Sequence, residues 1–330
     1  MENLPLVVLT GPTAVGKTKL SIDLAKMLDG EIISADSMQV YRRMDIGSAK
    51  IRPEETEGIP HYLIDEIEPT EEFNVVKFQE MAKAALQKIY ANGHIPILVG
   101  GTGFYIQALL DDIHLTENPG DTSFREELQQ MAEEKGEEVL YEKLCEVDPK
   151  AAEEIHKNNR KRVIRALEYY HQTGEPISAH NEREKQRRSP YQFLYFVLTD
   201  DRKLLYERID KRVDQMLEEG LLEDVRTLKE SGCTKDMVSM QGLGYKEILA
   251  FLDGDYETLE KAVEDLKKNT RHFAKRQLTW FRRERDVIWL DKSEFGYDET
   301  KILYKMKELC LEKGILNTET KGKHAENGNE

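Results

Sequence analysis

Eight residues near the start of the chain form a loop whose composition suits the binding of linked phosphate groups. The stretch GPTAVGKT matches the pattern G-x-x-x-x-G-K-[ST] and consists of Gly11, Pro12, Thr13, Ala14, Val15, Gly16, Lys17 and Thr18. It follows the apolar run 6–9 and precedes a helix-like pattern, which is the context that makes this motif specific. In such a loop, backbone N–H groups hold a diphosphate, Lys17 reaches its outer oxygens and the Thr18 hydroxyl binds Mg²⁺. The sequence therefore predicts a diphosphate site with Mg²⁺ as its cofactor.

Two other positions could act on a substrate beside this loop. Enzymes that hydrolyse ATP with such a loop usually carry a second apolar strand that ends in a metal-binding acid. The apolar stretch 95–99 runs instead into the glycines and threonine of GGTG, which disfavours ATP hydrolysis. Asp36 ends the predicted strand 31–36, and beside a phosphate loop a general base or metal-shell role is favoured over a simple turn. Thr102 of GGTG could orient an acceptor, or the turn could only allow close backbone packing.

The elements that must position these residues alternate between strands and helices. The stretches 6–9, 31–36 and 95–99 predict strands, and helices are expected after the phosphate loop and over residues 73–92. This order predicts an α/β fold in which helices flank a parallel sheet. Ligands then lie at the carboxyl ends of the strands.

The pattern changes in the middle of the chain. Residues 118–190 indicate charged helices without a convincing strand, 193–198 restores a strand, and another helix opens near Asp200. We therefore expect a discontinuous core, 1–117 and 191–315, interrupted by an all-helical insertion domain at 118–190. The tail 316–330 lacks apolar periodicity and is expected to be disordered.

Composition limits the class of protein. A length of 330 residues with 39% hydrophobic content predicts one or two globular domains. No apolar run approaches the roughly 18 residues that span a bilayer. The three cysteines lack the spacing of a zinc site or a disulfide framework. We expect a cytoplasmic protein, and nothing in the sequence requires more than a monomer.

The distribution of charge matters more than its sum. A net charge of −15, taken alone, argues against a nucleic-acid partner, but basic residues cluster at 157–165, 183–188 and 271–285. Any one of these clusters could be a solvated helix face. The last combines Phe273, Trp280 and Phe281 with six Lys and Arg, a composition suited to phosphates and stacked bases.

Several motifs, taken in order, resemble the bacterial tRNA dimethylallyltransferases, also called tRNA isopentenyltransferases, of the IPP transferase family. They are GPTAVGKT, ISADSMQVYRRMDIGSAK (33–50), HYLID (61–65), ILVGGTGFYI (97–106), NRKRVIRALE (159–168), QGLGYKE (241–247) and TRHFAKRQLTWFRR (270–283). The resemblance implies a P-loop kinase-like core for the α/β part of the chain. It also implies transfer of a dimethylallyl group from its diphosphate to N6 of the adenosine immediately 3′ of the anticodon, with release of pyrophosphate. It also implies that Asp36 is the general base, Thr102 helps to fix the acceptor and Lys17 stabilises the leaving group.

The resemblance implies a tRNA-binding surface drawn from several segments. Its partner would be the anticodon stem-loop, contacted by residues of the motifs 33–50 and 97–106, by the helical insertion and by the basic motif 270–283. The residues implied are Asp36, Ser37, Met38, Gln39, Thr102, Arg125, Arg160, Lys161, Arg162, Val163, Ile164, Arg165, Arg271, Lys275, Arg276 and Gln277.

Two other enzyme classes share the phosphate loop. A small-molecule kinase would need ATP turnover but would not need three basic clusters. A prenyltransferase that acts on free adenylate shares the loop and the acid, and the basic helical insertion argues against it. A non-catalytic RNA-binding protein would keep the basic faces without needing Asp36 beside an intact loop.

Overall fold

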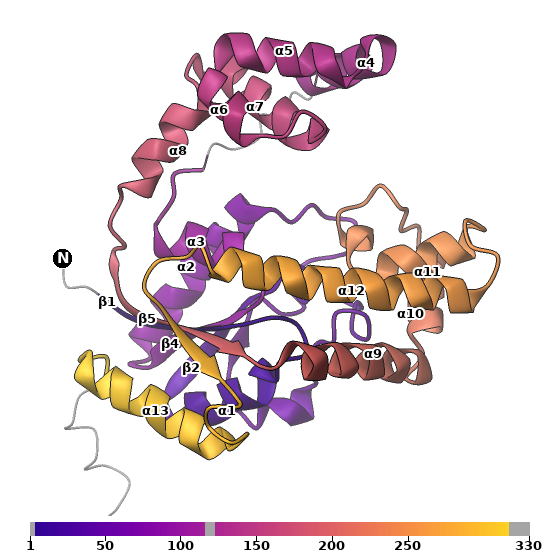
Figure 1. Ribbon diagram of the computed structural model, residues 1–330. Coiled ribbons are helices and arrows are strands. Elements are labelled where there is room, and N and C mark those ends of the chain that lie inside the picture. The colour runs from indigo at the N-terminus through magenta and orange to yellow at the C-terminus, as the bar shows by residue number, and fades with distance from the viewer. Residues whose placement is uncertain (1–3, 116–122, 317–330) are drawn as a thin grey trace, which may run out of the picture. The chain divides into compact units, whose positions relative to one another are not determined.

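The computed structural model describes residues 4–115 and 123–316 (Figure 1). Contacts divide the chain into two compact units, the first formed by Met1–Leu110 with Pro190–Glu330 and the second by Asp111–Ser189. The second unit begins at Asp111, earlier than the expected start of the insertion at 118. The expected disordered tail, 316–330, lies outside the described residues except for Leu316.

A parallel sheet of six strands forms the centre of the first unit, in the order β3-β2-β4-β1-β5-β6. The strands are β1 (Leu4–Thr10), β2 (Gly30–Ala35), β3 (His61–Tyr62), β4 (Ile95–Gly100), β5 (Tyr191–Thr199) and β6 (Val287–Asp291). The predicted α/β fold with a parallel sheet is confirmed. The edge strands β3 and β6 were not predicted from the sequence. One is too short for a periodic pattern and the other is only partly buried.

Helices cover both faces of this sheet, as the alternation of side chains along β1 shows. Leu6 and Val8 point into a core shared with α2 (Val75–Ala91) and α3 (Gly103–Leu110). Val7 and Leu9 point into a second core shared with α1 (Lys17–Leu28) and α13 (Glu299–Glu312). Successive residues of a strand face opposite sides, so a strand buried on both sides appears as a continuous apolar run.

The remaining helices of the first unit lie toward the C-terminus of the chain. They are α9 (Arg202–Glu218), α10 (Leu221–Glu230), α11 (Tyr245–Leu252) and the long α12 (Leu259–Phe281), which crosses the view in Figure 1. Asp201 caps α9 by accepting from the N–H groups of Lys203 and Leu204, and Thr258 caps α12. These caps satisfy N–H groups that a helix leaves unpaired in its first turn.

The described part of the second unit contains helices and no strand. These are α4 (Ser123–Lys135), α5 (Glu137–Val147), α6 (Pro149–Glu154), α7 (Arg160–Thr173) and α8 (Ile177–Lys185). Its own small core includes Leu140 and Leu144 of α5, one turn apart, and Val163 and Leu167 of α7. Asp148 caps α6 through Ala151 and also accepts hydrogen bonds from Ser178, so it joins α6 to α8.

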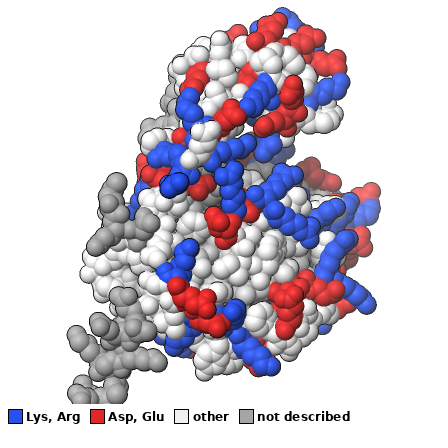
Figure 2. All heavy atoms as spheres, turned by 60° about the vertical axis from the view of Figure 1, so that its left-hand side comes forward, with Lys and Arg blue, Asp and Glu red and all other residues white. Residues whose placement is uncertain are grey.

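Acidic and basic side chains are mixed on the face of the molecule that Figure 2 draws. On this face, Lys and Arg lie between Asp and Glu, so the acidic residues do not form one continuous patch. The net charge of −15 is therefore a total that hides local basic areas.

Candidate active site

The phosphate loop has the backbone shape that its glycines allow. Gly11 has φ of 148°, and a Cβ there would lie 2.3 Å from the carbonyl oxygen of Leu198 on β5. Gly16 precedes α1 in the left-handed conformation, with φ of 99°. Both positions therefore require glycine, for space in one case and for backbone conformation in the other.

Lys17 lies back over its own loop. Its Nζ donates to the carbonyl oxygens of Gly11 and Pro12, each at 2.9 Å. Burial lowers the pKa of Lys17 from 10.5 to about 8; the nearby Arg212 acts in the same direction and Asp36 in the opposite one. Lys17 is thus mainly cationic at neutral pH, and an anion bound to the loop would stabilise that charge.

Asp36 directly follows β2 and is held by a local turn. Its Oδ1 accepts from the N–H of Met38 at 2.8 Å and from that of Gln39 at 3.4 Å. This arrangement is an Asx turn, so the turn and the catalytic readings of Asp36 are compatible. The turn orients the carboxylate, and Asp36 lines the cavity described next.

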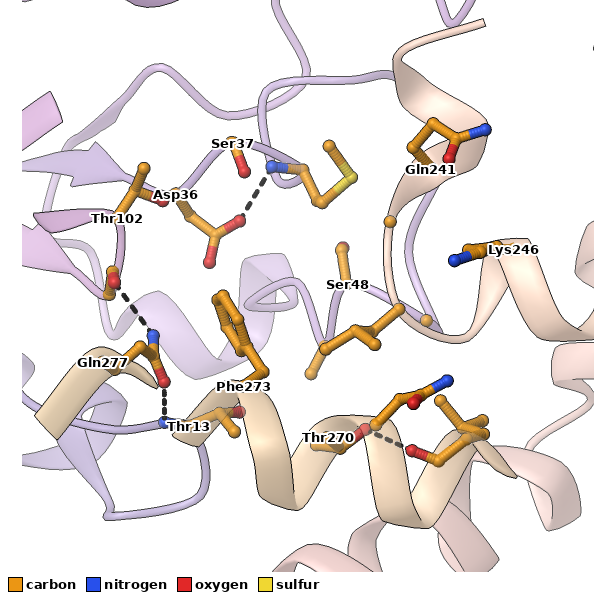
Figure 3. A pocket seen from close by; sticks show the side chains of 18 of the residues that line it. Thr13, Asp36, Ser37, Ser48, Thr102, Gln241, Lys246, Thr270, Phe273 and Gln277 are labelled. Carbon is orange, nitrogen blue, oxygen red and sulfur yellow. Dashed lines mark hydrogen bonds between the residues drawn. The ribbon is translucent and has the colours of Figure 1, made fainter. Parts of the chain in front are cut away.

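A cavity of about 580 Å³ lies where three neighbouring strands end (Figure 3). Thr13 and Ala14 reach it from the loop after β1, Asp36 from the end of β2, and Thr102 from the end of β4. Ligands of open parallel sheets bind at this edge. The apolar part of the wall includes Phe73, Tyr105, Ile209, Val213, Met216 and Leu266.

Helix α12 closes one side of the cavity with residues spaced three and four apart. Phe273, Arg276 and Gln277 line the cavity, and the Arg276 guanidinium lies 5.7 Å from the centre of the Phe273 ring. The Gln277 side chain accepts from the N–H of Thr13 and donates to the carbonyl oxygen of Gly101, both at 2.9 Å (Figure 3). This helix therefore contacts both the phosphate loop and the GGTG turn.

Arg212 of α9 lines the cavity and was not predicted from the sequence. Burial lowers its pKa below the usual range, whereas the negative charges of Asp36 and Glu219 act in the opposite direction. Arg212, Lys17 and Asp36 are close enough to influence one another, so the Asp36 carboxylate lies near two cations. The sequence contains no signal for this role, because α9 carries many charged residues and its pattern does not show which face meets a cavity.

Some residues of the first unit that were predicted to bind tRNA do not line the cavity and contact other parts of the protein. Ser37 and Met38 line the cavity, but the Gln39 amide bonds to Ser34 and to the carbonyl oxygens of Ser48 and Ala49. Gln39 thus supports the segment that carries Ser48 and is not among the cavity residues. Arg271 pairs with Asp210 on α9, and Lys275 is exposed on α12.

In the second unit, the predicted cations have different surroundings. Arg125 of α4 donates to both oxygens of the buried Glu168 of α7, at 2.7 and 2.9 Å. Arg160 bonds to the carbonyl oxygen of Gln129 and pairs with Glu133 at 3.2 Å. Lys161 and Arg162 are exposed, and Arg165 is half-buried.

For Val163 and Ile164 the prediction of tRNA contact needs correction. They are 1% and 5% exposed, and they pack in the core of the second unit. Their side chains therefore stabilise α7 and do not reach its surface. Their spacing with Leu167, at i, i+1 and i+4, is typical of the buried stripe of an amphipathic helix and could have revealed this.

The described residues contain neither a cluster of metal ligands nor a membrane-spanning helix. Among them, no group of three or more His, Cys, Asp or Glu could hold a metal ion. None of the helices in the described ranges is both long and apolar enough to cross a lipid bilayer.

Comparison with known proteins relates the chain to one family. The family model described as IPP transferase matches residues 39–284. A protein from Lachnoclostridium phytofermentans named tRNA dimethylallyltransferase is 62% identical over 312 residues, which cover 94% of this chain and 99% of its own. One of the same name from Acetivibrio thermocellus is 51% identical, covering 96% of this chain and 100% of its own.

Solved structures agree with these relatives. The tRNA isopentenylpyrophosphate transferase of Bacillus halodurans is 45% identical, with a TM-score of 0.70, covering 94% of this chain and 98% of that one. A eukaryotic dimethylallyltransferase acting on tRNA is 31% identical, with a TM-score of 0.79, covering 94% and 79%. The chain therefore belongs to the IPP transferase family, the family of the tRNA dimethylallyltransferases.

Proposed function

We propose that the protein transfers a dimethylallyl group from dimethylallyl diphosphate to N6 of the adenosine immediately 3′ of the anticodon (position 37) in tRNA. The products are N6-dimethylallyladenosine in the tRNA and free pyrophosphate. The observation that carries the proposal is the convergence of the phosphate loop, Asp36 and Thr102 on one cavity. A donor with a diphosphate and an acceptor with a proton to lose would need these groups side by side.

In the proposed reaction a carbon–oxygen bond of the donor breaks, which accounts for β4 being followed by glycines and not by a metal-binding acid. Pyrophosphate leaves whole in this reaction, so no water has to be positioned on phosphorus and no strand-end acid is needed there. The phosphate-loop N–H groups and the Lys17 ammonium would stabilise the negative charge that grows on the departing diphosphate. Arg212 adds a second cation to the same site.

The acceptor needs orientation and a proton acceptor, because a conjugated exocyclic amine is a weak nucleophile. Asp36 would accept a hydrogen bond from N6–H and take its proton as the new carbon–nitrogen bond forms. Thr102 would hold the base close to the allylic carbon. The apolar wall of the cavity, including Ile209 and Val213, suits the branched hydrocarbon of the donor.

The residues present fit a magnesium ion of the kind that phosphate loops use. Mg²⁺ takes most of its ligands from phosphate oxygens and water, with only one or two from the protein, so a cluster of carboxylates is not required. Thr18 is exposed in the first turn of α1, and its hydroxyl would be the protein ligand. When bound, the ion would neutralise charge on the leaving diphosphate.

The helical second unit would bind the anticodon stem-loop through its exposed cations. Lys161 and Arg162 at the start of α7 are free of the core and suit contacts to a phosphate backbone. The acceptor base would have to leave its stack to reach a cavity, which costs a few kcal/mol and is easier for a loop nucleotide than for a paired one.

The test is an incubation of the purified protein with Mg²⁺, radiolabelled dimethylallyl diphosphate and either unmodified tRNA or free AMP. We expect label on the tRNA alone, and digestion should place it on one adenosine beside the anticodon. Label on AMP would support a prenyltransferase of free nucleotides. Label on neither, together with ATP-dependent phosphoryl transfer, would support a kinase and overturn the proposal.

A further inference from the structure

Gln277 connects two parts of the active site that are far apart in the sequence. Its Oε1 accepts from the N–H of Thr13 in the phosphate loop, and its Nε2 donates to the carbonyl oxygen of Gly101 beside Thr102. The residue is 6% exposed, so both bonds are shielded from water. In Figure 3 its side chain lies between the segments that carry Thr13 and Thr102.

We propose that Gln277 is a positioning residue that fixes the distance between the diphosphate of the donor and the acceptor adenosine. The inference rests on the proposed function. It assigns to Gln277 a role within the protein, whereas the resemblance implied a contact with tRNA.

The chemistry of the two contacts is specific for a side-chain amide. Thr13 offers a backbone donor and Gly101 a backbone acceptor, and a Gln side chain carries one partner for each. A carboxylate would accept from Thr13 but would face the oxygen of Gly101 without a proton to share. A cationic side chain would have the reverse defect.

The packing around Gln277 leaves little freedom to replace it. A Cβ on Gly101 would lie 2.2 Å from Gln277 Nε2, and one on Gly103 would lie 2.3 Å from the Trp280 ring on the next turn of α12. The absence of side chains at these glycines lets the helix approach the turn closely. Gln277 and Trp280 thus hold α12 against the GGTG segment at two successive points.

The contacts continue to the general base. The N–H of Thr102 donates to the carbonyl oxygen of Ala35 at 3.2 Å, and Ala35 precedes Asp36. The phosphate loop is therefore linked through Gln277 and the peptide group between Gly101 and Thr102 to the end of β2, which carries Asp36. Since the N–H of Thr13 is used by Gln277, the diphosphate must be held by other groups of the loop.

Loss of the two Gln277 hydrogen bonds should slow the transfer step more than it weakens the binding of tRNA. A misplacement of about 1 Å between reacting groups can slow a reaction roughly 100-fold. For Gln277→Met, which removes both bonds at similar length, we expect single-turnover transfer to fall roughly 10–100-fold. We expect the dissociation constant for tRNA to change less than about 3-fold, because no exposed cation is removed. Gln87→Met makes the same change at an exposed position of α2 and should leave both values unchanged.

The pH dependence of transfer by Gln277→Glu distinguishes a positioning role from a purely structural one. The introduced carboxyl has the same shape, and when protonated it can again donate to Gly101 while accepting from Thr13. The ratio of variant to native transfer rate should therefore rise as the pH falls from 8 to about 5.5. The charged groups that line the cavity are the same in both proteins, so their titration largely cancels in this ratio; they are Asp36, Arg212, Lys246, Glu247 and Arg276.

A second measurement separates this inference from the proposed function. Hydrogen exchange with inorganic pyrophosphate and Mg²⁺ should show added protection in both segments 11–18 and 100–106 of the native protein, and in 11–18 alone for Gln277→Met. If native protein modifies tRNA but Gln277→Met transfers at the native rate, the positioning role is refuted while the function stands. If native protein modifies no tRNA, the function fails, and loss or retention of coupled protection in the variant supports or refutes the connection by itself.

Discussion

Asp36 and Met38 are joined by a hydrogen bond from the Met38 N–H to Asp36 Oδ1, 2.8 Å long. This bond forms the turn at the end of β2 and orients the carboxylate without using a distant partner. An asparagine could form the same turn, because its Oδ1 also accepts a hydrogen bond, but its amide cannot take a proton from N6. The relationship therefore separates the structural role of residue 36 from its chemical role.

Replacing Asp36 with Asn should preserve the turn and slow transfer. We expect single-turnover transfer to fall at least roughly 100-fold, as the loss of a general base predicts, with tRNA and pyrophosphate affinities within about 3-fold of native. Rapid-quench measurement with labelled donor provides the rate. Asp255→Asn, at an exposed turn, is the matched control. Near-native transfer by Asp36→Asn would remove Asp36 from the mechanism, whereas Asp36→Ala should lose the turn as well.

The lowered pKa of Lys17, about 8 against 10.5 in the unfolded chain, predicts a pH dependence of stability. Between these values the unfolded state binds a proton that the folded state lacks, so the free energy of unfolding rises with pH through this window. The unfolding free energy of the native protein minus that of Lys17→Met should rise by up to about 3 kcal/mol over this range and stay constant below pH 7. Urea titrations at several pH values measure it, and a flat difference would show that Lys17 titrates normally.

The pair between Arg125 and Glu168 predicts a stability effect within the second unit. Glu168 is 6% exposed, so removing its partner leaves a carboxylate buried without compensation. We expect Arg125→Leu to destabilise the second unit by about 2–4 kcal/mol and the double variant with Glu168→Leu to regain much of this loss. Native-state hydrogen exchange of α4 and α7 reports it.

The same variants decide whether Arg125 also contacts tRNA. If it does, the double variant recovers stability but not tRNA affinity. Equal recovery of both would limit Arg125 to its structural role.

The exposed pair Lys161 and Arg162 predicts a change in salt dependence. If both contact phosphates, changing them to Gln should reduce the slope of log affinity for tRNA against log salt by about 1 to 2. Lys135→Gln with Lys143→Gln removes the same charge from exposed positions of α4 and α5 and serves as the control. Filter binding at several salt concentrations measures both, and an unchanged slope for the first variant would exclude these contacts.

Local patterns were enough to predict the phosphate loop, the parallel sheet and the position of Asp36 at a strand end. The glycine spacing of GPTAVGKT and the apolar runs before and after it depend on neighbours in the sequence. Such patterns can be recognised without the tertiary structure, because strand and helix periodicity and turn chemistry are properties of short segments. The small edge strands β3 and β6 lacked a clear signal of this kind.

The tertiary structure decided which residues meet in the cavity. Gln277 contacts Thr13 across 264 positions of the chain and Gly101 across 176, and Arg212 comes from a helix with no motif. In the tertiary structure, Arg125 also pairs with Glu168, and Val163 and Ile164 are buried. A charged or amide side chain on a helix has the same local sequence pattern whether it faces solvent, a buried partner or a substrate. Only the packing of distant elements distinguishes these cases, because burial and hydrogen-bond partners are set by the fold and not by neighbouring residues.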